Sequence, residues 1–211
     1  DAFLTKQDLS RAPRFPAGRV DYRLAAAFKE NLLAEAWRRF SACPEGLRYD
    51  YEGFCRTERH WLDEYAAFRA LKAVLGRTPW NRWPEGFRTR RMKVLAQNVR
   101  EIAPLIEEEK FRQFVFFRQW TALRAYCKGR GIRVMGDLPC YVQHDSADVW
   151  GNPNLFKLDA EGRPAFVAGV PPDYFSRTGQ LWGNPVYDWD AHRKSRFAWW
   201  VARIRHNLKL F

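Results

Sequence analysis

Several features that define other classes of protein are absent from this chain of 211 residues. No apolar stretch approaches the ~18 residues of a membrane span. The N-terminus has no basic segment leading into an apolar run, which excludes the usual pattern of a signal peptide. Histidine occurs four times, and no H-E-x-x-H or comparable ligand spacing is present. We therefore expect a soluble, cytoplasmic protein with no membrane partner, no metal and no other cofactor.

Cysteine is scarce and its positions are widely spaced. No C-x-x-C pair occurs among Cys43, Cys55, Cys127 and Cys140. A chain this long, with 46% hydrophobic residues, can bury a core without cross-links. The sequence therefore predicts four reduced thiols.

Positive charge is in excess, with 36 basic and 24 acidic residues and a net charge of +12. Such a charge is one argument for nucleic-acid binding, which would weaken steeply with salt. However, the basic residues are spread through helical segments beside glutamates, and no basic run exceeds residues 88–91. No P-loop, zinc-finger spacing or ribonucleoprotein-type aromatic motif occurs. We expect a solvated helical surface and no nucleic-acid partner.

Helical periodicity dominates the first 130 residues. Apolar side chains at three-to-four spacing predict a helix from Asp21, as its N-cap, to Phe40, and a second from about Thr57 to Leu75. A turn over residues 79–86 follows. A third helix is expected from roughly residue 90, interrupted or kinked at Pro104, and the pattern strengthens over 106–128.

The period changes after residue 130. Ile132–Leu138 is short, β-prone and follows a helix stop, which predicts a strand of an α/β repeat. Segments 156–158 and 165–167 are expected to form a small hairpin. A last helix, capped by Asp188 or Asp190, is expected to extend to the end of the chain. Its apolar face comprises Phe197, Trp200, Val201, Ile204, Leu208 and Phe211.

Chemistry-bearing residues concentrate in the same C-terminal part. Asp137 ends the predicted strand, and that end of an α/β strand faces the active site. Its alternative role is to cap the following turn. The loop over 171–189 mixes aromatic rings, carboxylates and amides, as a carbohydrate site requires. Its candidate residues are Asp173, Tyr174, Phe175, Gln180, Trp182 and Asn184. An ordinary well-packed loop is the alternative interpretation of this mixture.

The cluster at residues 144–148 allows two interpretations. His144, Asp145 and Asp148 could be metal ligands, but one histidine and two carboxylates do not complete a first shell. The sequence favours an N-capped helical turn starting near Asp145.

An ordered series of motifs runs through nearly the whole chain. The C-terminal part carries GIRVMGDLP at 131–139, DSADVW at 145–150, GRP at 162–164, VAGVPPDYFS at 167–176 and GQLWGNP at 179–185. The helical part before it carries Phe54-Cys55, Trp61-Leu62, Tyr65-Ala66, Pro79-Trp80 and residues 117–120. In content and order, this series resembles the amylomaltase or 4-α-glucanotransferase family, glycoside hydrolase family 77.

The resemblance implies an α/β fold, a partial (β/α)8 TIM barrel with a large, mainly helical insertion. Residues 1–130 would hold the insertion and one barrel helix. Residues 131–211 would hold a barrel strand, the substrate loops and the following barrel helix. The implied reaction transfers α-1,4-glucan segments to a sugar acceptor with retention, through one nucleophilic carboxylate and one acid/base carboxylate.

The resemblance also implies that the catalytic pair is missing here. The family's nucleophilic aspartate lies in an Arg-x-Asp-His segment after the helix that ends this chain, and its acid/base glutamate comes later. Neither motif occurs in the sequence. The family's opening barrel segment is missing as well. We therefore expect this piece to be inactive by itself.

Position by position, the resemblance assigns binding rather than catalytic roles. Asp137 matches a strand-end aspartate that helps to order the catalytic centre. Residues 172–175 match a mobile loop that closes over the glucan, and Gln180 and Trp182 match sugar-subsite contacts. The expected partners are malto-oligosaccharides and α-1,4-glucans. The alternative is a non-catalytic α-glucan-binding fragment.

Overall fold

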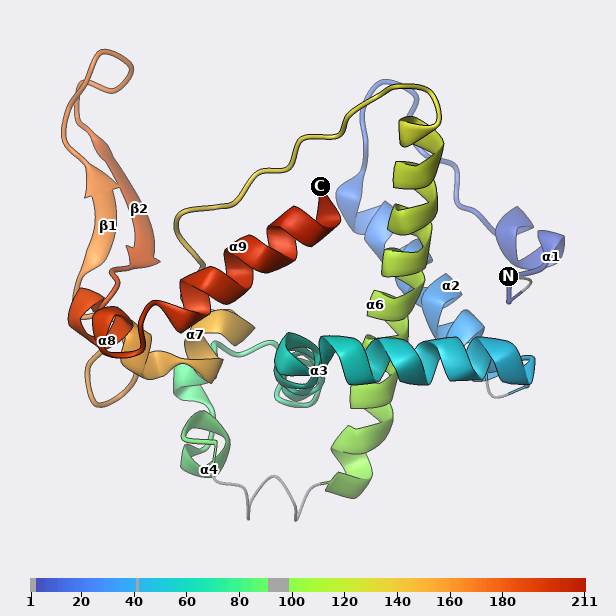
Figure 1. The fold of residues 1–211 in the computed structure, drawn as a ribbon, viewed down its shortest axis with the longest axis horizontal. Helices are drawn as coiled ribbons and strands as arrows, with labels where there is room; N and C mark the ends of the chain where they lie inside the picture. The colour runs from blue at the N-terminus through green and yellow to red at the C-terminus, as the bar shows by residue number, and fades with distance from the viewer. Residues whose placement is uncertain (1–2, 41, 91–98) are drawn as a thin grey trace.

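The computed structural model describes residues 3–40, 42–90 and 99–211 and is mostly helical, with a small two-stranded sheet (Figure 1). The first half contains α1 (Lys6–Ser10), α2 (Tyr22–Phe40), α3 (Glu45–Val74), η1 (Trp80–Arg82) and α4 (Glu85–Arg88). The second half contains α6 (Val99–Lys128), α7 (Ala147–Gly151), η2 (Pro153–Leu155), β1 (Val167–Val170), β2 (Gln180–Pro185), α8 (Trp189–Lys194) and α9 (Ala198–Leu210).

The helices α3 and α6 form the scaffold and cross each other near their middles (Figure 1). At one end of α3, rings from three helices make an aromatic core. Phe40 of α2 packs on Phe111 of α6 with ring centroids 4.9 Å apart, and Tyr51 of α3 packs edge-on against Phe114 at 5.5 Å. Because each of these rings is buried, apolar burial holds α2 against the α3–α6 pair.

A second core joins the far end of α3 to α7 and η2. It is rich in tryptophan, and the indole N–H of each of its three buried tryptophans, Trp80, Trp83 and Trp150, donates to a backbone carbonyl. Trp80 donates to His144 over 2.7 Å, and Trp150 donates to Phe87 over 3.1 Å. These bonds satisfy the polar edge of the rings that the core buries. The tryptophans of the proline-containing turn are therefore structural.

Three expectations about the helices meet different outcomes. Asp21 caps α2 by accepting from the Leu24 N–H over 2.9 Å, as predicted. The second helix was predicted to start too late. It begins at Glu45, because the packing of Tyr51 stabilises the earlier turns, and it ends at Val74, next to the predicted end at Leu75. Pro104 does not interrupt α6. It lies in the second turn, where it removes a single intrahelical bond. Residues 91–98 of the predicted helix lie outside the described residues.

The strand predicted at Ile132–Leu138 is wrong in this structure. The segment is an extended connection between α6 and α7 (Figure 1) and belongs to no described sheet. A strand requires a neighbour to complete its ladder of hydrogen bonds, and none of the described residues supplies one. The segment lies against α9 instead. A Cβ built on Gly136 would stand 2.1 Å from the Phe211 ring, so only glycine allows this close approach.

The small hairpin predicted over 156–158 and 165–167 forms only in part. Leu158 and Pro164 make an isolated antiparallel bridge, and the Ala165 N–H donates to the Lys157 carbonyl over 2.9 Å, but residues 156–166 contain no regular strand. The regular antiparallel pair is β1 with β2, and β2 lies inside the segment predicted to be loop. Gly169 permits this pairing, because a Cβ there would come within 2.6 Å of the Gln180 carbonyl oxygen. The pairing of β1 with β2 therefore requires glycine at position 169.

The last helix is divided in two. Asp188 caps α8 by accepting from the Ala191 N–H over 3.0 Å, which confirms one of the two predicted caps. The helix is interrupted at Arg196 and Phe197, both with positive φ, before α9 starts.

Among the described residues, no helix combines the length and the apolar character that a membrane span requires.

Candidate functional site

A hairpin arm, residues 167–185, carries most of the predicted site residues. It projects from the helical body, with the 171–179 loop at its tip (Figure 1). Tyr174 is 96% exposed and Phe175 is 90% exposed at this tip. Their rings meet edge-on with centroids 5.6 Å apart. The arm therefore presents two aromatic faces to solvent at its far end.

Hydrogen bonds within the loop hold this tip. The Asp173 carboxylate accepts from the backbone N–H groups of Phe175, over 3.0 Å, and Ser176, over 2.7 Å. The Ser176 hydroxyl donates to the Gly179 carbonyl over 2.7 Å. Gly179 has φ +73°, and a Cβ there would lie 2.5 Å from the Val170 carbonyl oxygen. The loop backbone is thus tied to itself while both rings stay free.

Strand β2 carries a second polar and aromatic group, which extends from the tip loop to the base of the arm. The Trp182 indole donates to the Gln180 side-chain oxygen over 3.0 Å, and its ring packs edge-on against Tyr141 at 5.8 Å. The Asn184 amide donates to the Val142 carbonyl over 2.9 Å. Trp182 remains 45% exposed. This arrangement leaves the indole face of Trp182 and the side-chain amide of the exposed Gln180 next to each other, as binding of a sugar ring requires.

Tyr141 and Tyr187 anchor the base. Tyr187 lies in the 171–189 segment that was predicted to bind sugar, but its anchoring role was not predicted, and Tyr141 was missed. The two rings stack at 5.9 Å, and burial raises the pKa of Tyr187 to about 12. The protonated Tyr187 hydroxyl donates to the Cys140 carbonyl over 2.7 Å. The only signal in the sequence was aromatic density near the arm, which does not identify stacking partners.

Asp137 is separate from this group. It is exposed on the connection between α6 and α7, and the Asn207 side-chain amide of α9 donates to its backbone carbonyl over 3.0 Å. Of the seven predicted residues, the structure places three in the tip loop of the arm, three along β2 and Asp137 against α9.

The 144–148 cluster forms the predicted helical turn, with the cap one residue later. Ser146 caps α7 by accepting from the Val149 N–H over 3.3 Å. His144 is hydrogen-bonded to the Gly162 carbonyl over 2.7 Å, and Asp145 pairs with Lys72 over 2.5 Å. Each of these side chains has a structural partner.

A cavity of about 340 Å³ between α3, α7 and α9 was not anticipated. Burial raises the pKa of two carboxyl groups in its lining, Glu64 and Asp148. The basic groups Arg90 and Arg203 oppose these shifts. Arg203 also lies over the Trp199 ring at 4.5 Å. These residues come from segments far apart in the sequence, so local patterns could not have grouped them.

Comparison with known proteins finds close similarity along the chain. The profile of the 4-alpha-glucanotransferase family matches residues 1–211. The 4-alpha-glucanotransferase of Thermus thermophilus is 49% identical over 201 residues, covering 94% of this chain and 40% of the relative. That of Synechocystis sp. is 43% identical over 211 residues, covering 99% of this chain and 42% of the relative.

A solved structure gives the same result. The amylomaltase from Streptococcus agalactiae in complex with acarbose matches with a TM-score of 0.90 and 34% identity. The match covers 99% of this chain and 42% of that one. This chain thus spans about two fifths of the length of the relatives that it matches. The resemblance found in the sequence is confirmed, and the chain belongs to the 4-alpha-glucanotransferase family.

Proposed function

We propose that this chain is a glucan-binding part of a 4-α-glucanotransferase. The whole enzyme would transfer α-1,4-glucan segments to a sugar acceptor with retention, in the metabolism of maltodextrin, starch or glycogen. The 211 residues contain neither the Arg-x-Asp-His segment of the nucleophile nor the later acid/base motif, so the piece alone would be inactive. Support comes from family membership over residues 1–211 and from the arm.

The exposed aromatic pair at the tip is the observation that carries the proposal. Two adjacent rings at 96% and 90% exposure, on a loop held by its own hydrogen bonds, form an exposed apolar patch of the kind that marks a ligand-binding surface. A glucose ring offers an apolar C–H face that stacks on Tyr174 and Phe175. Covering the bound glucan would also exclude water from a covalent intermediate, which favours transfer over hydrolysis.

The remaining predicted residues divide by what their polar atoms already bind. Gln180 and Trp182 have open surface along β2, which supports direct sugar contacts there. Asp173 and Asn184 make hydrogen bonds to the backbone, so their contribution to glucan binding includes holding the arm in shape. Asp137, exposed beside α9, would lie near the catalytic centre that the rest of the enzyme completes.

The architecture follows the same proposal, a partial (β/α)8 barrel with a helical insertion. Residues 1–130 would be the insertion with one barrel helix, and residues 131–211 a barrel strand, the arm and the next barrel helix. Two uncovered surfaces support it. The extended segment has Met135 at 94% exposure, and α9 exposes its apolar face. That face includes Val201, Ile204 and Leu208. A neighbouring strand of the barrel would cover both.

A cytoplasmic location and the absence of nucleic-acid and membrane partners remain part of the proposal. All four thiols are free, which suits a reducing compartment. Several basic side chains are paired with carboxylates, for example Arg39 with Asp8 and Lys110 with Asp63. Such pairing lowers the positive charge available to a polyanion.

The test follows tryptophan fluorescence during titration with maltoheptaose. Wild type should give a saturable change, and Trp182→Ala should lose it, because that indole lies at the proposed sugar contact. Tyr126→Ala on α6, an exposed ring away from the arm, is the matched control and should titrate like wild type. No saturable change in the wild type would refute glucan binding.

A second measurement separates the enzyme proposal from its alternative, a non-catalytic glucan-binding piece. The purified chain should not disproportionate maltotriose above background. The complete protein should do so if it is a glucanotransferase. Glucan binding by the chain together with an inactive complete protein would favour the alternative. Turnover by the chain alone would show that its acid/base pair lies within these residues.

A further inference from the structure

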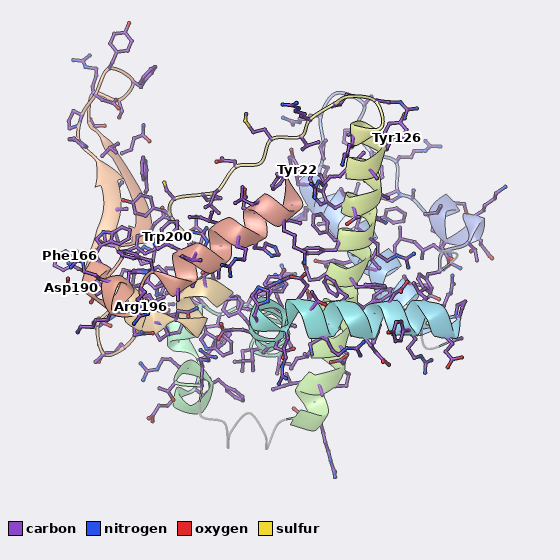
Figure 2. All side chains as sticks on the ribbon, viewed as in Figure 1. Tyr22, Tyr126, Phe166, Asp190, Arg196 and Trp200 are labelled. Atoms are coloured by element: carbon purple, nitrogen blue, oxygen red, sulfur yellow. The ribbon has the colours of Figure 1, made fainter. Side chains whose placement is uncertain are left out.

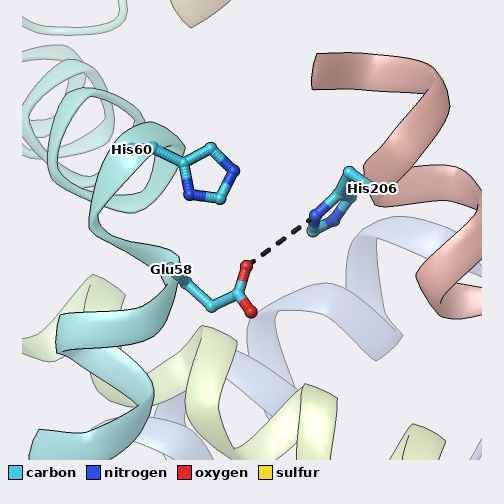
Figure 3. Close-up of side chains that lie close together, drawn as sticks. All are labelled: Glu58, His60 and His206. Carbon is cyan, nitrogen blue, oxygen red and sulfur yellow. Dashed lines mark ion pairs between the residues drawn. The ribbon is translucent and has the colours of Figure 1, made fainter. Parts of the chain in front are cut away.

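Three potential metal ligands meet where side chains of α9 reach α3. Glu58 and His60 lie on α3, and His206 lies on α9 and faces them (Figure 3). One ligand atom from each residue lies within 4.8 Å of the other two. We propose that this cluster, the α3–α9 metal site, binds one divalent transition-metal ion of the zinc type.

The donor set is suited to such an ion. Two imidazoles and one carboxylate form a His₂Glu set, which binds Zn²⁺ with bonds of about 2.0–2.2 Å and leaves a fourth position open. Ligand atoms around a tetrahedral ion of that size lie about 3.4 Å apart. The three side chains therefore need to close by about 1 Å. His60 is exposed, so its ring has room to rotate, whereas the His206 ring packs against Trp61 and Phe117 and can shift less.

Glu58 is the fixed ligand of the three. It is only 2% exposed, and its Oε2 accepts from the Trp61 indole over 2.7 Å. The Lys209 ammonium pairs with Oε1. His206 Nδ1 stands 3.8 Å from Oε2, on the side where a metal would lie. A carboxylate has about four lone-pair positions, so Trp61 and Lys209 can stay bound while Oε2 takes a metal.

Trp61 and Lys209 would then act as outer partners that orient the ligand. They also explain how Glu58 stays charged and buried without a metal. The site would accordingly bind its ion reversibly, and folding would not depend on the metal.

The position of the site predicts its effect. Glu58 lies on α3 and His206 lies on α9, and most of the chain separates these two helices in sequence. The ion would therefore link α3 to the last helix, α9. His60, Trp61 and His206 also line the cavity between α3, α7 and α9, so the open coordination position is accessible from that cavity. Binding should therefore raise the stability of the contact between α3 and α9.

The test uses the chain after chelator treatment, with Zn²⁺ as the probe in equilibrium dialysis and thermal unfolding. We expect one Zn²⁺ per chain and a Tm that rises with Zn²⁺ concentration. His60→Ala and His206→Ala should each weaken binding at least about tenfold, because each removes one ligand of three. His144→Gln, which changes an imidazole outside the cluster, is the control and should bind within about twofold of wild type.

Substituting Co²⁺ adds a readout of geometry, because a tetrahedral site with histidine ligands gives visible absorption bands that His60→Ala should diminish. Far-UV circular dichroism checks that each variant folds. His60 is exposed, so His60→Ala decides the question even if His206→Ala unfolds. The proposal is overturned if wild type binds no Zn²⁺, or if both alanine variants bind it as tightly as His144→Gln.

Discussion

The Asn184 side-chain amide donates to the Val142 backbone carbonyl over 2.9 Å and ties the base of the arm to the body. Val142 is buried, so the bond satisfies an acceptor that water does not reach freely. This bond joins a side chain of β2 to a backbone group of the preceding connection, and it orients the arm together with the packing of Tyr141 on Trp182 and Tyr187. The side chains of the arm extend from this base, beside the labelled Phe166, towards the tip (Figure 2).

Replacing Asn184 should therefore loosen the arm. Asn184→Ala leaves the Val142 carbonyl without its partner, and we expect the free energy of unfolding to fall by about 1–2 kcal/mol. Urea unfolding measures the change. Asn154→Ala, which removes an exposed amide elsewhere, is the control and should stay within about 0.5 kcal/mol of wild type. Equal losses in the two variants would argue against a specific role for the Asn184 bond.

Replacing glycine with alanine at two positions should change the free energy of unfolding in opposite directions. Gly179→Ala should destabilise by about 1–3 kcal/mol, because the position has φ +73° and the new Cβ would collide with the Val170 carbonyl. Gly46→Ala should stabilise by up to about 1 kcal/mol, because it lies in α3 with open space around it. Thermal unfolding compares the two variants. A neutral Gly179→Ala would contradict the conformation of the tip.

The link between α1 and α2 predicts a pH dependence. Asp8 accepts from Arg39 over 2.6 Å and from the Thr5 N–H over 2.7 Å, and the Arg39 hydrogen bond, then those from Thr5, lower the pKa of the Asp8 carboxyl well below its usual range. A group whose pKa is lower in the folded state stabilises fully above its unfolded pKa of about 3.9. This stabilisation is lost as the pH falls from there through the folded pKa.

Asp8→Asn should accordingly be less stable than wild type at pH 7, and the difference should shrink as the pH falls below about 4. Urea unfolding of both proteins across this range measures it. Asp190→Asn, at an exposed carboxylate on α8, serves as the control. A difference that stays constant down to the lowest pH studied would contradict the assigned shift.

Local patterns predicted the helices well where periodicity and caps agree. Asp21 and Asp188 act as caps, and the helix predicted to end at Lys128 does so. The strand at Ile132–Leu138 failed because strand formation depends on a partner, and that partner is not among the described residues. The end of α3 was predicted within one residue, but its start was predicted too late, because tertiary packing stabilises the earlier turns. Strand β2 was missed, because its pairing with β1 across Gly169 has no local signal.

The candidate site was predictable in composition and only partly in arrangement. The mixture of rings, amides and carboxylates at 173–184 was visible in the sequence, and the structure collects it on one arm. The stacking of Tyr141 on Tyr187 and the meeting of Glu58 with His206 join residues that are far from each other in sequence. Such contacts follow from the global fold, and no local spacing encodes them.

Binding of maltoheptaose to Tyr174→Ala/Phe175→Ala, measured by calorimetry, tests the central claim most directly. Both rings are almost fully exposed, so the double variant should fold with unchanged stability. We predict that it binds at least about tenfold more weakly than wild type, because stacking on the sugar faces is lost. The control Phe116→Ala/Tyr126→Ala removes two exposed rings of α6 and should bind normally. Equal affinity of the double variant and wild type for maltoheptaose would contradict the assignment of the arm as the glucan-binding element.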